Sequence, residues 1–380
     1  MRADAPRPPL RVGFDARWYN NSGVGTYVAG LLGAMSRLSE VELMVYEDPA
    51  NPVPELAAKC SRKPVRCGKY SLHAQIELAS LCREDRLHLF HSPFYVAPFF
   101  ASCPVVITVH DLIAFLFPIV PWAKQALVRF GYQAAVKKSA HIIAVSAHTA
   151  RDLREILHVP GEHITVVHNA ACRDLFRPEK QADEWRYLQG KYQLQPRYVV
   201  VASAGNWQTK NLQAALAALD LARQISEETF QIAVFGPEEG LNSIRTRPTD
   251  IRALGYIPAS DLAMLFRHAH ALVAPSLYEG FGLPALAAMC CGCPVIASDQ
   301  GALPEIVAYG GQVFAPGDIA GMARAVAELL CRRDMLERWR NSGLKRAADF
   351  SWERAARETL RVYHHVAFGE QPKTMLAAAD

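Results

Sequence analysis

The stretch from Pro275 to Ser298, PSLYEGFGLPALAAMCCGCPVIAS, decides how this chain is expected to fold. Its turn EGFG leads directly into an apolar helix, because Pro284 suits the first helical position and Gly292 suits the position after the last turn. The segment PVIAS that follows has the pattern of a buried strand. The turn therefore places backbone N–H groups at a helix N-terminus, where phosphate oxygens bind.

Glu279 stands directly beside this turn. A carboxylate repels bare phosphate, so it is expected to face hydroxyl groups. Phosphate on one side and hydroxyl groups on the other indicate a sugar nucleotide as the ligand.

The same stretch resembles the donor-site signature of glycosyltransferase family 4, whose members have the GT-B fold. That signature has a Glu, then GFGLP, then a second Glu, then a small-residue turn and PVI. Glu279 and the run Gly280–Pro284 match it, whereas Ala287 stands where the second Glu is usual. In the family the second Glu accepts hydrogen bonds from the ribose, so its absence predicts weaker donor binding, about 10- to 150-fold for one charged hydrogen bond.

Length and composition agree with a globular protein of two domains. The chain has 380 residues, 51% of them hydrophobic and 21% charged, with a net charge of +4. This balance and the lack of a dense Lys/Arg run argue against nucleic acid as a partner. No apolar run is long enough to cross a bilayer and the N-terminus lacks a secretory core, so a cytoplasmic location is expected. Cys290, Cys291 and Cys293 are expected to be buried and reduced.

Short, continuous apolar runs alternate with helical patterns along the chain. This is typical of parallel strands covered on both faces. The predicted fold class is α/β: the GT-B fold, with two Rossmann-like, doubly wound domains and a cleft between them. The expected domains are residues 1–175 and 176–351. A helix over about 352–370, N-capped by Ser351, is expected to pack back on the first domain, as the resemblance implies.

Candidate site residues follow the predicted strands, where ligands of doubly wound sheets collect. Gly23 and Gly25 are expected in a loop that precedes a helix near Thr26, where backbone approaches a ligand. Such a turn is common in α/β proteins, and it is the resemblance that places it near the donor sugar and phosphates. His110 matches the family's His-Asp element, in which the His approaches the transferred sugar, and Asp111 is equally a cap for the next segment.

Lys210 and Asn211, after the first strand of the second domain, match the family's Lys-Asn pair. An ammonium group there neutralises a diphosphate leaving group; the alternative is a solvated surface lysine. The catalytic residues so implied are His110, Lys210 and Glu279. The implied donor-binding residues are Gly23, Gly25, Asn206, Lys210, Tyr256, Ile257, Glu279, Gly280, Phe281, Gly282 and Leu283.

The resemblance implies a retaining, metal-independent glycosyltransferase of glycan, polysaccharide or glycolipid synthesis, with no cofactor besides the donor. A nucleotide diphosphate sugar would be the donor, with mannose ranked first, and an oligosaccharide or lipid-linked glycan would supply the acceptor hydroxyl. Two alternatives stay open: an impaired sugar-nucleotide-binding partner of an active transferase, and a sugar-nucleotide epimerase. Basic residues among aromatics over 121–138 suggest either a peripheral contact with the inner face of a membrane or a solvated helix.

Overall fold

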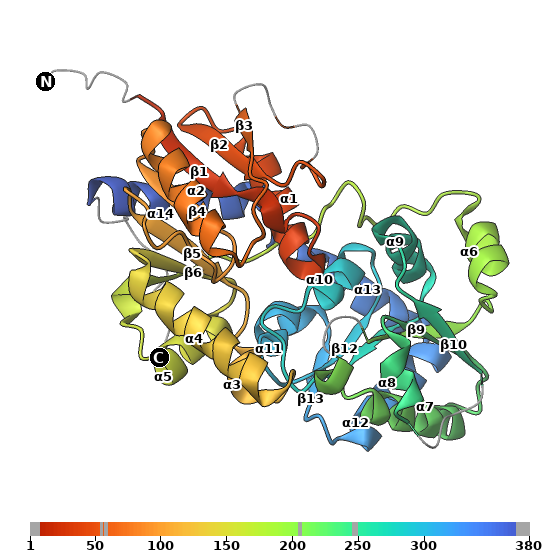
Figure 1. Cartoon of the computed structure of the whole chain (residues 1–380). Coiled ribbons are helices and arrows are strands. Elements are labelled where there is room, and N and C mark those ends of the chain that lie inside the picture. The colour runs from red at the N-terminus through yellow and green to blue at the C-terminus, as the bar shows by residue number, and fades with distance from the viewer. Residues whose placement is uncertain (1–7, 54–55, 57–59, 204–206, 245–249, 370–380) are drawn as a thin grey trace, which may run out of the picture. The chain divides into compact units, whose positions relative to one another are not determined.

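The computed structural model describes residues 8–53, 56, 60–203, 207–244 and 250–369 of the chain. The chain divides into two compact units, each built on its own parallel sheet (Figure 1). Unit 1 comprises the chain up to Ala170 together with the segment from Ser351 onward, and unit 2 comprises Ala171–Phe350. Two doubly wound α/β domains, the expected fold class, are thereby confirmed.

Unit 1 has a seven-stranded sheet in the order β3-β2-β1-β4-β5-β6-β7, in which all recorded pairings are parallel. Its strands are β1 (Leu10–Asp15), β2 (Val41–Glu47), β3 (Cys60–Pro64), β4 (Leu89–Ser92), β5 (Val105–Val109), β6 (His141–Ala144) and β7 (Ile164–Val166). The run VVITV in β5 is buried at every position, as expected for a central strand with helices on both faces.

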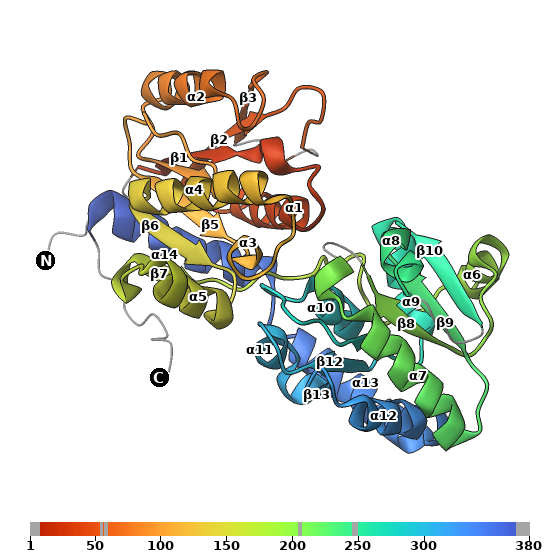
Figure 2. The same ribbon diagram turned by 60° about the horizontal axis from the view of Figure 1, so that its bottom comes forward.

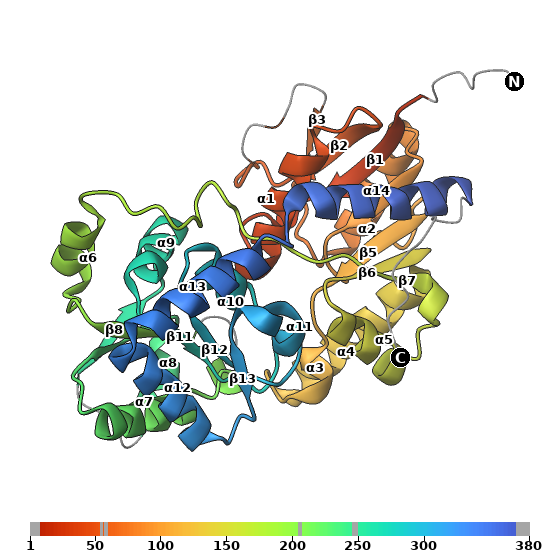
Figure 3. The same cartoon turned by 180° about the vertical axis from the view of Figure 1, so that it is seen from behind.

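The helices of unit 1 lie on both faces of this sheet. They are η1 (Ala16–Trp18), α1 (Ser22–Met35), α2 (Leu72–Glu84), α3 (Ile113–Leu116), α4 (Trp122–Lys138), α5 (Ala147–Leu157), η2 (Gly161–His163) and α14 (Trp352–Phe368). Figure 2 shows α4 in front of the sheet with α2 above it, and Figure 3 shows α14 running across the opposite face. The chain runs from β1 to β2 toward one edge of the sheet, and from β3 to β4 and from β5 to β6 toward the other edge. Because crossovers between parallel strands are normally right-handed, the connecting helices are expected on both faces.

The C-terminal helix α14 packs on α1, β4 and β6. Ser351 caps its N-terminus, with the side-chain oxygen accepting a hydrogen bond from the backbone N–H of Arg354. Gly30 permits the close approach of α1 and α14, because a Cβ atom at that position would lie 2.0 Å from Cε2 of Trp352. The helix predicted over 352–370 thus forms, and it belongs to unit 1.

Unit 2 has a six-stranded sheet in the order β10-β9-β8-β11-β12-β13, again with parallel pairings. Its strands are β8 (Tyr198–Ala202), β9 (Gln231–Phe235), β10 (Ile251–Gly255), β11 (Leu272–Ala274), β12 (Val295–Ser298) and β13 (Gln312–Phe314). Its helices are α6 (Glu184–Tyr192), η3 (Trp207–Thr209), α7 (Leu212–Ser226), α8 (Glu238–Asn242), α9 (Ala259–His268), α10 (Leu283–Cys290), α11 (Leu303–Val307), η4 (Ala308–Gly310), α12 (Ile319–Cys331) and α13 (Arg333–Ala347).

A core fills each unit. In unit 2, the apolar sides of α7 and α12 pack together over Val199, Val201 and Val273 of the sheet. In unit 1, Phe90, Ile107 and the α4 residue Tyr132 belong to the corresponding core. None of the helices described in the structure has an apolar stretch long enough to span a bilayer.

Candidate functional site

The EGFG turn of unit 2 forms the N-terminus of α10, as the sequence predicts. Gly282 is the N-cap residue, with a φ of +94°, a conformation that L side chains rarely adopt. A Cβ atom there would also lie 2.9 Å from Cδ2 of Leu303. Gly292 follows the helix with a φ of +69°, and the N–H of Cys293 bonds to the carbonyl of Ala288. The helix is therefore terminated at both ends by glycines in the left-handed region.

Lys210 is the charged partner of Glu279. Its Nζ lies 2.5 Å from Oε1 of Glu279, and the side chains of Lys210 and Glu279 are only 9% and 16% exposed. The two residues come from different loops, one between η3 and α7 and the other between β11 and α10. A hydrogen bond of 2.7 Å from the backbone N–H of Leu277 to the carbonyl of Thr209 joins these loops. Lys210 is thus not a solvated surface lysine.

Ser276 holds the same carboxylate from the other side. Its Oγ donates a hydrogen bond of 2.8 Å to Oε1 of Glu279, and its carbonyl accepts one of 2.5 Å from Oγ of Ser298. Both serines are buried. With Oε1 engaged by Lys210 and Ser276, Oε2 of Glu279 has no donor within the described part of the chain and is the oxygen available to a ligand hydroxyl.

The backbone of Glu279 is fixed as well. Its carbonyl accepts a hydrogen bond of 2.9 Å from the N–H of Ala302. Gly301 lies against it with a φ of +63°, and a Cβ atom at that position would lie 2.5 Å from both the backbone nitrogen and the backbone oxygen of Glu279. The loop after β12 therefore supports the carboxylate, a role that its sequence did not reveal.

The first turn of α10 offers donors for an anion next to this pair. Among the described residues, the N–H groups of Gly282 and Leu283 have no acceptor, whereas that of Ala285 bonds to the carbonyl of Gly282. Open N–H groups at a helix N-terminus carry the positive end of the helix dipole. Together with the ammonium of Lys210 they make this corner of unit 2 suited to phosphate oxygens.

Ala287 lies one turn further along α10 and is buried, 5% exposed. It presents no acceptor for a ribose hydroxyl. Cys290, Cys291 and Cys293 are also buried and have free thiols, as expected. Burial raises the pKa of the Cys290 thiol to about 11 and of the Cys291 thiol to about 12, which keeps both protonated at neutral pH. Among the described residues, no group of three or more His, Cys, Asp or Glu side chains gathers as metal ligands do.

The remaining predicted donor contacts in unit 2 lie at the end of β10. Tyr256 and Ile257 follow that strand and precede α9, and the Tyr256 side chain is 74% exposed. The carbonyl of the preceding Gly255 accepts a hydrogen bond of 2.8 Å from the N–H of Gly236 after β9, which sets the two loops side by side. Asn206 lies outside the described residues.

In unit 1, His110 follows β5 and is half-buried. Its Nε2 bonds at 2.9 Å to the carbonyl of Pro93, which can only accept, so Nε2 carries the proton and Nδ1 is left as an acceptor. Burial lowers the pKa of His110 to about 4, so the ring is neutral at pH 7. Tyr27 packs edge-on against this ring, with centroids 5.0 Å apart. The Asp111 side chain accepts a hydrogen bond of 3.1 Å from the N–H of Ile113, the first residue of α3.

The expectation for Gly23 and Gly25 was wrong in one respect. Helix α1 begins at Ser22, so both glycines lie in its first turn and not in a loop before it. The reason for Gly25 is packing: a Cβ atom there would lie 2.0 Å from the carbonyl oxygen of Tyr19. A Cβ atom at Gly23 would meet nothing within 4 Å. Gly25 therefore serves the close contact between the Tyr19 segment and α1.

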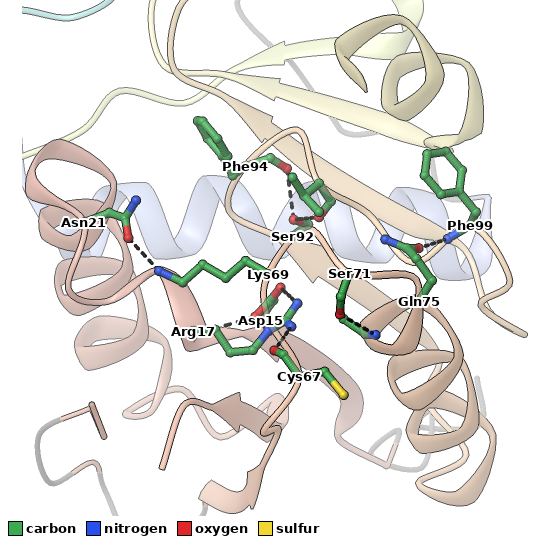
Figure 4. Close-up of polar contacts among 12 residues, drawn as sticks. Asp15, Arg17, Asn21, Cys67, Lys69, Ser71, Gln75, Ser92, Phe94 and Phe99 are labelled. Atoms are coloured by element: carbon green, nitrogen blue, oxygen red, sulfur yellow. Dashed lines mark hydrogen bonds and ion pairs between the residues drawn. The ribbon is translucent and has the colours of Figure 1, made fainter. Parts of the chain in front are cut away.

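Sequence reasoning missed a polar cluster at the carboxyl ends of β1, β3 and β4 (Figure 4). The buried Arg17 guanidinium binds both carboxylate oxygens of Asp15, each at 2.8 Å. The Lys69 ammonium donates to Oδ1 of Asn21 and lies 4.9 Å from the centroid of a ring of Trp18. The contact between Lys69 and Asn21 joins residues 48 positions apart, which their spacing in the sequence does not reveal.

Solved structures of known proteins share the fold of this chain. Sucrose-phosphate synthase from Thermosynechococcus elongatus superimposes with a TM-score of 0.76 at 20% identity, covering 95% of this chain and 100% of that one. HepE from Anabaena, solved in complex with UDP and glucose, superimposes with a TM-score of 0.71 at 15% identity, covering 93% and 99%. The fold is that of the GT-B glycosyltransferases.

The family follows from the sequence matches. Residues 21–172 match the family described as Glycosyltransferase Family 4, and residues 195–332 match Glycosyl transferases group 1. O-antigen chain mannosyltransferase B of Escherichia coli is 29% identical over 323 residues, which cover 81% of this chain and 82% of that protein. The chain belongs to the glycosyltransferases of family 4.

Proposed function

We propose that the protein transfers a sugar from a nucleotide diphosphate sugar to a hydroxyl group of a glycan, with retention at the anomeric carbon. The observation that carries this proposal is the Lys210–Glu279 pair at the N-terminus of α10. It joins a cation and open N–H groups, which suit a diphosphate, to a carboxylate oxygen that suits sugar hydroxyls. We rank mannose first among the sugars to be tested, with GDP-mannose as its donor, and the name of the mannosyltransferase relative supports the choice of sugar.

Each group has a separate part in this proposal. Lys210 and the first-turn N–H groups of Gly282 and Leu283 bind the diphosphate and stabilise the negative charge that develops on it as the glycosidic bond breaks. Oε2 of Glu279 accepts hydrogen bonds from the transferred sugar. The leaving phosphate takes the proton of the acceptor hydroxyl, so no protein base is required. We propose no metal and no cofactor beyond the donor.

Three other contacts with the donor or its sugar stay predictions. They are those of the amides of Gly280 and Phe281, of the loop at Tyr256 and Ile257, and of the Nδ1 acceptor of His110. The acceptor that we propose is an oligosaccharide or a lipid-linked glycan, and the second case includes a peripheral contact with a membrane.

A panel of nucleotide sugars tests the proposal directly. A bound donor raises the melting temperature with its concentration, so the panel first selects the donor by thermal shift. Release of the nucleoside diphosphate is then measured with and without glycan acceptors. The expected result is acceptor-dependent release by the parent protein and its loss in Glu279→Ala and Lys210→Ala. Conversion of the donor to another sugar nucleotide, to the same extent with and without an acceptor, would indicate the epimerase instead.

The buried Ala287 favours one second candidate, a sugar-nucleotide-binding protein without turnover. That candidate predicts a thermal shift by the donor but neither transfer nor hydrolysis, and recovery of transfer in Ala287→Glu. Because the site is buried, Ala287→Glu is expected to lower the melting temperature without ligand. A variant that gains donor affinity but not transfer rate would show that the parent enzyme already has its full catalytic set.

A further inference from the structure

The ring of His110 is in contact with the ring of Tyr27, which belongs to α1. The two rings meet at 83° with their centroids 5.0 Å apart, so they form an edge-to-face pair. The imidazole is also tied to the loop after β4, because its Nε2 donates a hydrogen bond of 2.9 Å to the carbonyl of Pro93. Tyr27 is only 1% exposed, so it can influence a bound ligand only through His110.

The hydroxyl of Tyr27 begins a chain of buried hydrogen bonds. It lies 2.8 Å from Oγ1 of Thr108 in β5, and that oxygen lies 2.8 Å from Nε2 of His91 in β4. Nδ1 of His91 lies 2.5 Å from the hydroxyl of Tyr363 in α14, which in turn lies 3.7 Å from Sδ of Met35. All five side chains are buried. The chain of hydrogen bonds thus runs from α1 through two strands to the C-terminal helix, and ends at the last residue of α1.

A count of protons fixes the direction of these hydrogen bonds. Each of the three hydroxyl groups carries one proton, and burial lowers the pKa of His91 to about 3, so its neutral ring carries one as well. Every proton has an acceptor if Tyr27 donates to Thr108 and Thr108 donates to Nε2 of His91. Nδ1 of His91 then donates to Tyr363, and Tyr363 donates to the sulfur of Met35, which can only accept. In the opposite direction the proton of Tyr27 would have no acceptor in the described part of the chain.

Strand geometry and α14 together fix the place of Tyr27. Thr108 lies two residues before His110, and side chains two positions apart along an extended strand point to the same face, which agrees with the contacts of Tyr27 with both. Helix α14, which runs across one face of the sheet in Figure 3, packs on α1 and on β4. The ring of Trp352 in α14 lies 6.0 Å from that of Tyr27, at 70°. Tyr27 is therefore enclosed between the sheet and α14, and its ring has little freedom to turn.

We infer that Tyr27 is a positioning residue for His110. The hydrogen bonds that end at Tyr363 and Met35 hold the ring of Tyr27, and this ring holds the imidazole in one orientation, with Nε2 on the loop after β4 and Nδ1 as an acceptor. The C-terminal helix α14 thereby contributes to the site through a residue far from it in the sequence. The inference rests on the proposed function, because it concerns the histidine that is predicted to bind the transferred sugar.

Steady-state kinetics of conservative variants of the full chain test this inference. Tyr27→Phe keeps the ring and removes the hydroxyl, and Thr108→Val and Tyr363→Phe each remove one further hydroxyl at nearly constant shape. Each of the three variants should lower kcat/KM about 2- to 10-fold, the loss expected for one neutral hydrogen bond. Tyr27→Leu also removes the ring, so the imidazole can turn, and kcat/KM should fall at least about ten-fold.

Thr165→Val and Tyr198→Phe are the matched controls. Oγ1 of Thr165 in β7 bonds at 2.8 Å to Nε2 of the buried His141, so the first control breaks the same kind of hydrogen bond in the same sheet. The buried Tyr198 in β8 donates a hydrogen bond of 2.6 Å to the carbonyl of Leu265. Both controls should keep the kinetics of the parent. Circular dichroism melts show whether each variant is folded, and if Tyr27→Leu is not, the three hydroxyl variants still carry the test.

A double-mutant cycle with His110→Ala separates positioning from a general loss of stability. If Tyr27 acts through the imidazole, its substitution should change kcat/KM less than about two-fold once His110 is absent. The same fractional loss with and without His110 would overturn the inference, because Tyr27 would then act independently of the histidine.

The protonation of the histidine rings gives a reading that does not depend on activity. Nuclear magnetic resonance of protein labelled with ¹⁵N-histidine should show His110 protonated on Nε2 and His91 on Nδ1, and the variants His110→Ala and His91→Gln assign these signals. Tyr27→Leu should shift and broaden the signals of His110, whereas Thr165→Val should leave them unchanged. Unchanged signals of His110 in Tyr27→Leu, or protonation of His91 on Nε2 in the parent, would overturn the inference.

The proposed glycosyl transfer is judged separately from the positioning role. If the rings are protonated as expected and respond to Tyr27→Leu, but the parent transfers no sugar, the proposed function alone is rejected. If the parent transfers sugar, but Tyr27→Leu costs the same with and without His110, the positioning role of Tyr27 alone is rejected.

Discussion

The Nζ atom of Lys210 lies 2.5 Å from Oε1 of Glu279, although the two residues stand in different loops of unit 2. This contact compensates two nearly buried charges before any ligand is bound. It also brings a group suited to phosphate and a group suited to sugar hydroxyls to one end of α10.

Removal of one partner of the pair should cost both stability and activity. Lys210→Met leaves the Glu279 carboxylate with only Ser276 as a donor, so unfolding should become easier by about 1–3 kcal/mol. The value of kcat/KM should fall about 100- to 1000-fold, because one preorganised donor to the leaving group is lost. Urea unfolding and steady-state kinetics measure the two effects.

The double variant Lys210→Met/Glu279→Gln separates these effects. Because no charge is left unpaired, the double variant should recover most of the lost free energy of unfolding. Its kcat/KM should stay as low as that of the single variants. A double variant as unstable as the sum of both singles would show that the two side chains do not act as an ion pair.

Ser276 is expected to affect activity indirectly, because its hydroxyl holds the Glu279 carboxylate in position. Ser276→Ala removes the 2.8 Å hydrogen bond to the carboxylate. A hydrogen bond to a charged group is worth about 1.5–3 kcal/mol, so kcat/KM should fall about 10- to 150-fold. Ser276→Thr keeps the hydroxyl and should restore part of the activity.

Ser226→Ala is the matched control, since the Ser226 hydroxyl also makes a hydrogen bond, to the carbonyl of Ala222 on α7. It should leave the kinetics unchanged. If Ser276→Ala and Ser276→Thr were equally impaired, crowding of the loop and not the hydroxyl would be responsible.

Gly301→Ala should displace the Glu279 loop. A methyl group would lie 2.5 Å from the backbone nitrogen and oxygen of Glu279, and the φ of +63° would strain any side chain. The free energy of unfolding should fall by about 1–3 kcal/mol, and donor affinity by thermal shift should fall with it. Gly317→Ala is the control, because a Cβ atom there meets nothing within 4 Å. Equal affinity in Gly301→Ala and the parent would mean that the loop relaxes without moving the carboxylate.

Neutral histidines that are wholly or partly buried should make the stability of the protein depend on pH. Burial lowers the pKa of His91 to about 3, and that of His110 and His141 to about 4. Between pH 6.5 and pH 4 the unfolded chain therefore binds more protons than the folded protein, so stability falls as the pH falls. From pH 7 to pH 5 each such histidine should remove about 2 kcal/mol.

His141→Gln provides the test, because this ring is buried and bonds to the hydroxyl of Thr165 at 2.8 Å. Denaturant unfolding at pH 7 and pH 5 should show a smaller difference in this variant than in the parent, by about 2 kcal/mol. An unchanged difference would show that His141 is already protonated in the folded protein at pH 5.

Three strands lack the continuous apolar run that the sequence analysis takes as the mark of a strand, and their position explains why. β10 and β13 are the two edges of the sheet in unit 2, and β3 is an edge of the sheet in unit 1. Edge strands are covered on fewer sides and need fewer apolar residues, as the sequences CSRKP in β3 and IRALG in β10 show. Periodicity reveals a strand only where burial demands apolar side chains.

The sequence by itself determined the central strands, the glycine-bounded helix α10 and the presence of Glu279 beside it, because local conformation and burial dictate residue type at those positions. Only the tertiary structure decided that Lys210 meets Glu279, that Ser276 and Gly301 support the same carboxylate, and that the loop after β4 contacts both α2 and α4. Residues that meet across loops leave no periodic trace in a chain, since the sheet and not their spacing brings them together.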